Sequence, residues 1–230
     1  MPTLYHHPMS TASRFIRLVL SEYGFQVDLV EEQTWEKRRE FLSLNPAGTL
    51  PVYVDDNMRV LCGPVVISEF LDETHGVLKR DRRLLAEDPF QRAEIRRLTE
   101  WFLQKMEQDV TKPLVRERVH KLLIPNGLGG GAPDSKVLRT ARGNIRQHMK
   151  YLSWLSGSRQ WLAGDRLSYA DLAAAASLSV LDYLGEIEWS EFPIAKEWYQ
   201  RLKSRPSFRP LLAERLRGLT PVSHYADLDF

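Results

Sequence analysis

Cysteine is almost absent from this chain, since Cys62 is the single one among 230 residues. One thiol excludes an internal disulfide and a cluster of metal-binding thiolates. Long apolar runs are missing too: the longest candidate, residues 172–180, falls far short of the about 20 residues that a membrane-spanning helix needs. The first residues also lack the basic and apolar regions of a signal peptide. We therefore predict a cytoplasmic protein with no membrane partner.

An excess of charge of one sign is also missing. The 32 basic and 30 acidic residues are mixed along the chain, and the formal net charge is only +2. Nucleic-acid-binding proteins more often concentrate a basic excess, so we expect no nucleic-acid partner. What the chain does contain is 43% hydrophobic residues, which is enough to build the core of one large domain or two small ones.

The pattern of the chain changes near residue 80. Residues 1–78 alternate strand and helix signals in the order β-α-β-α-β-β-α, which predicts a small α/β domain. Residues 79–88 are a charged segment without apolar periodicity and are predicted to be a linker. Residues 89–220 show only helical signals, and residues 221–230 form a tail that either folds back over a ligand cleft or faces a partner.

The first predicted helix, Ser10–Tyr23, illustrates the reasoning. Phe15 and Val19 recur at helical spacing and define its inner face, whereas Arg14 is expected on the outer face. Gly24 is expected to end the helix, because glycine readily adopts the left-handed conformation found there. Later helices are predicted over residues 35–44, 64–73, 90–123, 136–154, 168–185, 193–204 and 207–217.

Two segments carry a resemblance to a known family. The first is Asn45–Val52, of sequence NPAGTLPV, followed by Ile67–Leu71, of sequence ISEFL. The second is Gly164–Asp171, of sequence GDRLSYAD, which reads as a helix start with a capping box. Both segments resemble the cytosolic glutathione transferases. The resemblance implies a thioredoxin-like N-terminal domain, an all-helical C-terminal domain, and a cis peptide bond that joins Leu50 to Pro51.

The family's glutathione site is damaged at Gly63 and Pro64. Members that bind glutathione place Glu or Gln followed by Ser at these positions, where the two residues bind the glutamyl end of the tripeptide. Gly63 has no side chain, and Pro64 has neither a hydroxyl nor an N–H group. The loss of charge-assisted hydrogen bonds, at about 1.5–3 kcal/mol each, weakens binding by orders of magnitude. Leu50, Pro51, Gly63 and Pro64 therefore mark a vestigial site, and we expect no cofactor.

A transferase would still need a group that stabilises the glutathione thiolate. The family places it near the first helix start, where Ser10 is the main candidate and Tyr5 an alternative. The competing interpretation of Ser10, which we favour, is a plain helix cap. His6 and His7 have no third ligand at metal spacing, so we predict a solvent-facing strand end and not a metal site.

Within the family, the segment Ser168–Trp189 and the C-terminal tail resemble those of division proteins of alphaproteobacteria that bind FtsZ. This resemblance implies a non-catalytic homodimer that binds FtsZ filaments at the division site and promotes constriction. The alternative is an enzyme that conjugates glutathione to small electrophiles. For the partner surface we single out an exposed tryptophan, a basic helical stripe and two tail acids: Trp35, Arg139, Arg142, Arg146, Asp227 and Asp229. Lys136 and Lys150 lie on the same stripe.

Overall fold

The N-terminal domain is built on one small mixed sheet. The computed structural model describes residues 1–230, and its four strands are ordered β2-β1-β3-β4. They are β1 (Thr3–His6), β2 (Asp28–Glu31), β3 (Val52–Val54) and β4 (Val60–Cys62). β1 pairs in parallel with β2 and antiparallel with β3, and β3 pairs antiparallel with β4. The predicted order of strands and helices along this domain is confirmed.

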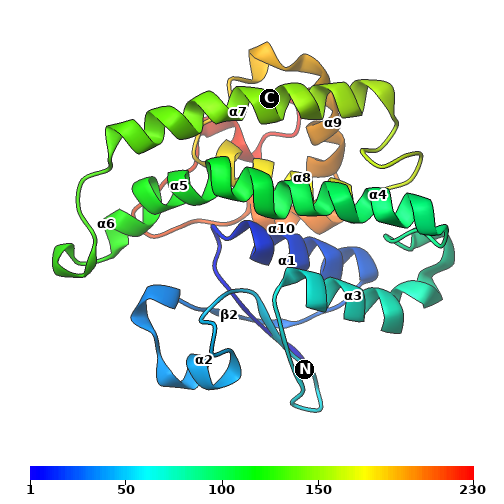
Figure 1. Ribbon diagram of the computed structural model, residues 1–230, viewed down its shortest axis with the longest axis horizontal. Helices are drawn as coiled ribbons and strands as arrows, with labels where there is room; N and C mark the ends of the chain where they lie inside the picture. Colours follow the sequence, from blue (N-terminus) through cyan, green and yellow to red (C-terminus); the bar gives the residue numbers. More distant parts are fainter.

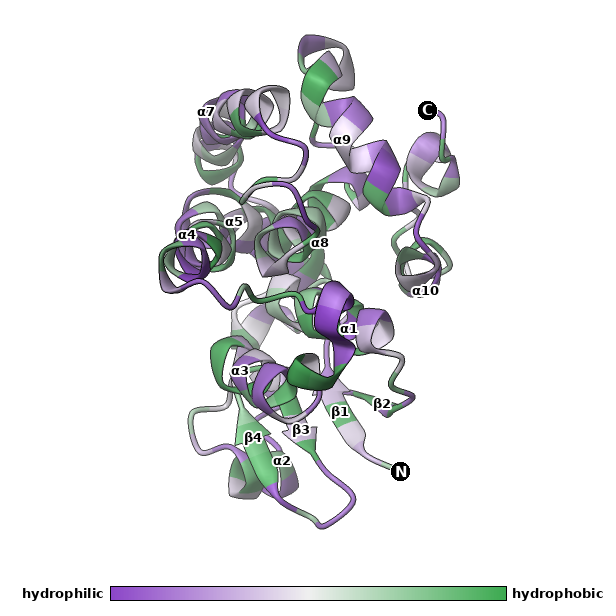
Figure 2. Cartoon of the chain, turned by 90° about the vertical axis from the view of Figure 1, so that its right-hand side faces the viewer, coloured by the Kyte–Doolittle hydropathy of each residue, from purple (hydrophilic) through white to green (hydrophobic).

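Helices cover both faces of this sheet (Figures 1 and 2). They are α1 (Thr11–Tyr23) and α3 (Pro64–Thr74) on one face and α2 (Arg39–Leu44) on the other. Alternation along β3 explains the two layers: Tyr53 belongs to the main core, whereas Val52 and Val54 pack with Phe41 of α2 in a separate cluster.

The helix predicted over residues 35–44 is interrupted. A short 3-10 turn, η1 (Thr34–Glu36), precedes α2, and Lys37 between them has a φ of 50°. This left-handed conformation is rare for a side-chain-bearing residue and breaks the helical path. The turn between β3 and β4 is held by Asp55, whose carboxylate accepts hydrogen bonds from the backbone N–H groups of Asn57 and Arg59 at 2.9 and 2.8 Å.

The second domain is entirely helical, as predicted. One long helical stretch runs through α4 (Pro89–Glu100), η3 (Trp101–Thr111), α5 (Lys112–Val115), η4 (Arg116–His120) and α6 (Lys121–Leu123), with wider π-type turns in η3 and η4. It is followed by α7 (Ser135–Ser158), α8 (Tyr169–Tyr183), α9 (Pro193–Lys203) and α10 (Arg209–Leu212). Short 3-10 turns complete the chain: η2 (Gly76–Arg82), η5 (Asn126–Leu128), η6 (Trp189–Glu191), η7 (Pro206–Phe208) and η8 (Ser223–Ala226). None of the helices is long and apolar enough to cross a bilayer.

Helix α8 is the centre of the molecule. All of its residues are buried, and it packs on α1 as well as on α4 and η3 (Figure 2). Its start is held by the predicted capping box between Ser168 and Asp171. The Asp171 carboxylate also accepts hydrogen bonds from the Leu162 N–H at 2.8 Å and the Trp198 indole at 3.3 Å. Burial raises the pKa of Asp171 to about 6.

Arg14 is buried, which corrects the prediction that it lies on the outer face of α1. Its side chain is 0% exposed, because α8 of the second domain covers this side of α1. The guanidinium donates to the Pro8 carbonyl at 2.6 Å, to Ser179 of α8 at 2.8 Å and to the Tyr225 hydroxyl at 3.1 Å. It also forms an ion pair with Glu214 at 3.2 Å. Apolar periodicity within one helix could not reveal these distant partners.

The last predicted helix, residues 207–217, is shorter than expected. Only α10 is α-helical there. Beyond it the backbone N–H of Leu216 donates to the Tyr183 hydroxyl at 3.0 Å instead of to a helical carbonyl, and Leu216 forms an isolated bridge with Leu219. A tertiary hydrogen bond thus replaces the last helical turns.

Candidate functional site

The region that corresponds to a glutathione site lies around the starts of α1, β3 and α3. Ser10 is the N-cap of α1, and its hydroxyl accepts a hydrogen bond from the Ser13 N–H at 3.2 Å. The interpretation as a helix cap is therefore satisfied by the geometry. The peptide bond between Leu50 and Pro51 is cis, as the family resemblance implies.

The start of α3 shows what Gly63 and Pro64 do to this region. Gly63 is the N-cap, with φ 89° and ψ 152°, a backbone region that glycine alone populates readily. Its N–H donates to the Pro51 carbonyl at 3.0 Å, and no side chain caps the helix. Pro64 occupies the first helical turn, where the missing N–H removes one donor that a carboxylate would use.

His6 and His7 are buried at 6% and 5% exposure, which corrects the prediction of a solvent-facing strand end. Burial is the first cause that lowers the pKa of His6 to about 3 and that of His7 to about 4, and the positive charge of Arg14 adds to both shifts. Both imidazoles are therefore neutral at pH 7. His7 Nδ1 accepts the Met9 N–H at 3.2 Å, whereas His6 Nδ1 has no partner.

Trp35 packs between the two domains. Its ring lies 5.7 Å from the ring of His7 and 5.0 Å from that of His120 in η4, and the two histidine rings are 5.5 Å apart. Trp35 remains partly exposed. It is therefore a half-covered aromatic contact at the domain edge.

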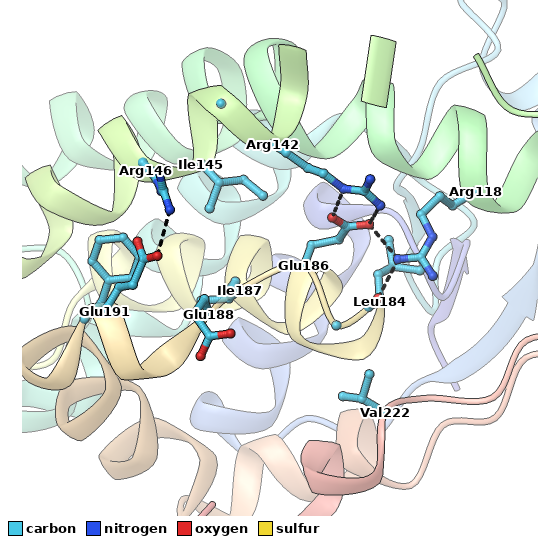
Figure 3. Close-up of a pocket in the computed structure, with 13 residues that line it drawn as sticks. Arg118, Arg142, Ile145, Arg146, Leu184, Glu186, Ile187, Glu188, Glu191 and Val222 are labelled. Atoms are coloured by element: carbon cyan, nitrogen blue, oxygen red, sulfur yellow. Dashed lines mark hydrogen bonds and ion pairs between the residues drawn. The ribbon is translucent and has the colours of Figure 1, made fainter. Parts of the chain in front are cut away.

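The largest part of the basic stripe borders a groove on the second domain (Figure 3). A hollow of about 690 Å³ lies between α7 and the segment that follows α8. Arg142 and Arg146 of α7 lie on one wall, and Glu186 and Glu191 lie on the other. A second hollow of about 310 Å³, lined by Lys150 and Ile194 among others, shares Glu191 and Phe192 with the first. We call the combined feature the α7 groove.

Ion pairs tie the two walls together. Glu186 has a side chain that is 3% exposed and accepts Nε and Nη2 of Arg142 at 2.8 and 3.0 Å. It also accepts Nη1 of Arg118 at 2.6 Å. These two guanidinium groups hold the pKa of Glu186 below its usual value, against the opposing effect of its burial. Arg146 donates Nη2 to Glu191 at 2.7 Å.

The tail packs on the helical domain and also contacts α1 of the N-terminal domain. Tyr225 is buried and bonds to Arg14 and to the Leu211 carbonyl. Phe230 lies over Lys203, with Nζ 3.9 Å from the ring centroid. Asp227 and Asp229 between them remain exposed.

The structure thus separates the predicted partner residues into three places. Arg142 and Arg146 meet at the α7 groove, and Arg139 lies one turn away on α7. Trp35 contacts His120 of η4, the same segment that supplies Arg118 to the groove. Sequence reasoning missed Glu186 and Arg118, because their pairing joins segments 68 residues apart and leaves no periodic signal.

Comparisons with known proteins agree with this architecture. The family model for the glutathione S-transferase N-terminal domain matches residues 4–81, and the model for the C-terminal domain matches residues 133–206. The chain belongs to the glutathione S-transferase family.

The similar proteins include FtsZ-localized proteins and glutathione S-transferases. The chain is 45% identical over 231 residues to FtsZ-localized protein A of Caulobacter vibrioides, a match that covers 99% of this chain and 98% of that protein. The crystal structure of a glutathione S-transferase from Sinorhizobium meliloti 1021 matches with a TM-score of 0.99 at 80% identity and covers 100% of both chains. The structure of FzlA from C. crescentus matches with a TM-score of 0.92 at 45% identity and covers 100% of this chain and 99% of that one.

Proposed function

We propose that this protein is a non-catalytic, homodimeric adaptor that binds FtsZ filaments at the division site and promotes constriction. The observation that carries the proposal is the 45% identity to FtsZ-localized protein A over essentially the whole length of both chains. Two copies of a filament-binding surface on one dimer supply a means to bridge filaments through avidity, without catalysis.

The state of the glutathione region supports a non-catalytic role. The start of α3 offers neither the side chain nor the hydroxyl and N–H that hold the glutamyl end, because Gly63 and Pro64 occupy those positions. Ser10 is engaged as the cap of α1. We propose that the chain works without glutathione or any other cofactor.

Exposed apolar side chains on both domains support a homodimer. On the N-terminal domain, Met58 is 77% exposed and Val65 and Val66 are each more than half exposed. On the second domain, Phe90 is 88% and Trp154 is 60% exposed. Family dimers join the first domain of one copy to the second domain of the other, and one two-fold interface can cover both apolar sets.

The proposed filament-binding surface consists of Trp35, the arginines of α7 and the tail acids. Arg139, Arg142 and Arg146 form a basic face on α7, whereas Asp227 and Asp229 project from the tail. Electrostatic complementarity of this kind steers association and weakens with salt. Asp227→Lys is expected to reduce co-sedimentation with FtsZ filaments without changing the dimer mass in light scattering. Unchanged co-sedimentation would remove Asp227 from the surface.

The experiment that tests the function combines two titrations of the purified protein. FtsZ assembled with GTP is expected to carry the protein into the pellet in a saturable manner. Calorimetric titration with glutathione is expected to show no binding tighter than millimolar. Absence of filament binding would overturn the proposal, and tight glutathione binding would overturn the non-catalytic part of it.

A second candidate function is glutathione conjugation. It is favoured by the 80% identity to the glutathione S-transferase from Sinorhizobium meliloti 1021 and by the hydroxyl of Ser10 at the start of α1. This alternative predicts retention on glutathione resin and turnover of an aryl halide that is lost in Ser10→Ala.

A further inference from the structure

A glycine in the middle of α7 is the starting point. Gly143 lies in the interior of a 24-residue helix, where glycine costs about 1 kcal/mol relative to alanine. Nothing lies within 4 Å of the place where its Cβ would stand. No neighbouring segment of this chain therefore requires the missing side chain, and the open space above Gly143 is the α7 groove.

The surroundings of Gly143 are long cationic side chains. Arg139, Arg142, Arg146 and Lys150 follow helical spacing with Gly143, so all five residues share one face of α7. Because Gly143 has no side chain, the α7 wall of the groove is recessed between Arg142 and Arg146. A glycine in such a position lets the backbone of a bound segment approach the helix closely.

The floor of the α7 groove is apolar. Ile145, Ile187 and Phe192 present the edges of their side chains to it, and Ile194 at one end is 50% exposed. A bound segment therefore meets apolar surface at the bottom and charge at the rim.

Charge decides the chemistry of that segment. The groove is lined by four cations, Arg118, Arg142, Arg146 and Lys150, and by three carboxylates, Glu186, Glu188 and Glu191. Glu186 is buried, so two carboxylates are accessible. Arg142 and Arg146 are 53% and 67% exposed and use only part of their donors on Glu186 and Glu191. The accessible charge along α7 is positive and complements carboxylates.

We infer that the α7 groove is the docking site for a short acidic segment of the protein partner, with an apolar anchor side chain on the floor and its backbone against Gly143. The inference rests on the proposed function, because it assigns that segment to FtsZ. It differs from binding to the basic face as a whole, because here the absence of a side chain at Gly143 is what lets the segment enter the groove.

A glycine-filling variant tests the site without damaging the fold. Gly143→Leu places a side chain in the groove and improves helix propensity, so its melting temperature is expected to equal or exceed that of the wild type. Binding to assembled FtsZ is expected to weaken at least tenfold. Thr140→Leu, an exposed position on the same helix outside the groove lining, adds the same side chain and is expected to bind like the wild type.

A charge reversal tests the chemistry. Arg146→Glu is expected to weaken binding and to reduce its dependence on NaCl between 50 and 300 mM, because one cation that faces the partner is lost. Arg166→Glu, at a cation whose side chain is 72% exposed and which lies outside the α7 groove and the basic stripe, is the matched control and retains binding.

The outcomes separate the two proposals. If the wild type binds filaments and Gly143→Leu binds equally well, the groove assignment is wrong and the adaptor function stands. If the wild type does not bind filaments at all, the adaptor function and this inference are both overturned. Loss of binding in Gly143→Leu alone, with Thr140→Leu unaffected, supports the groove.

Discussion

The burial of His6 predicts a specific dependence of stability on pH. The pKa of His6 is lowered from 6.5 to about 3 in the folded protein, first because of burial and then because of the charges of Arg17, His7 and Arg14. The unfolded chain binds a proton at this site below pH 6.5, whereas the folded protein does not. The stability that the neutral ring contributes is therefore complete above pH 6.5 and is lost as pH falls toward 3.

The magnitude follows from the shift. At pH 5, about 1.5 units below the pKa of the unfolded chain, proton binding to the unfolded state lowers the free energy of unfolding by about 2 kcal/mol. His7, with a pKa of about 4, adds a similar loss. Asp171 acts in the opposite direction, because its raised pKa of about 6 stabilises the fold as pH falls below 6. The total is a large share of an ordinary domain stability of about 5–15 kcal/mol.

The variant His6→Phe isolates the effect. His6 Nδ1 has no hydrogen-bond partner, so the change removes the titratable ring without breaking a hydrogen bond at this atom. Urea unfolding at pH 7 and pH 5, followed by tryptophan fluorescence, is expected to show that the variant loses about 2 kcal/mol less than the wild type over this interval. Tyr5→Phe on the same strand serves as control and keeps the wild-type slope. Parallel pH profiles for His6→Phe and the wild type would refute the reasoning.

Three further predictions follow from other contacts. Tyr225→Phe removes the hydroxyl that Arg14 and the Leu211 carbonyl share, and it is expected to lower the unfolding free energy by about 1–3 kcal/mol in urea titrations; an unchanged midpoint would mean that Arg14 finds another acceptor. The double variant Gly63→Gln and Pro64→Ser restores the family's polar pair and is expected to bind glutathione more tightly in calorimetry. Its free energy of unfolding is expected to fall by about 1–3 kcal/mol, because Gln must adopt the backbone conformation that Gly63 has in the wild type. No gain in affinity would show that other parts of the site are also lost. Gly143→Ala is expected to raise the unfolding free energy by about 1 kcal/mol, and a decrease would show that the space above Gly143 is occupied within this chain.

Local patterns in the sequence predicted the elements well. The cap at Ser10, the left-handed Gly24 and the capping box at Ser168 depend on a few neighbouring residues, and the structure contains each of them. These features follow from backbone chemistry that a short segment carries by itself.

Long-range polar contacts could not be predicted in the same way. Arg14 looks like a surface residue when only its helix is considered, yet its partners Ser179 and Tyr225 are 165 and 211 residues away. The burial of His6 and His7 has the same origin, since the second domain and η1 cover the end of β1. The acidic wall of the α7 groove was missed because Glu186 follows α8 and meets Arg142 only in the folded chain.

The position of Arg14 has a consequence for how the protein is made. A single apolar core of 51 buried residues runs through both domains, and Arg14 finds its last two partners, Glu214 and Tyr225, only near the end of the chain. During synthesis the N-terminal domain therefore emerges with an unsatisfied charge on the face of α1 that the second domain will cover. A fragment that ends at the linker is expected to aggregate or to stay unfolded, and the full chain is expected to unfold in one cooperative transition.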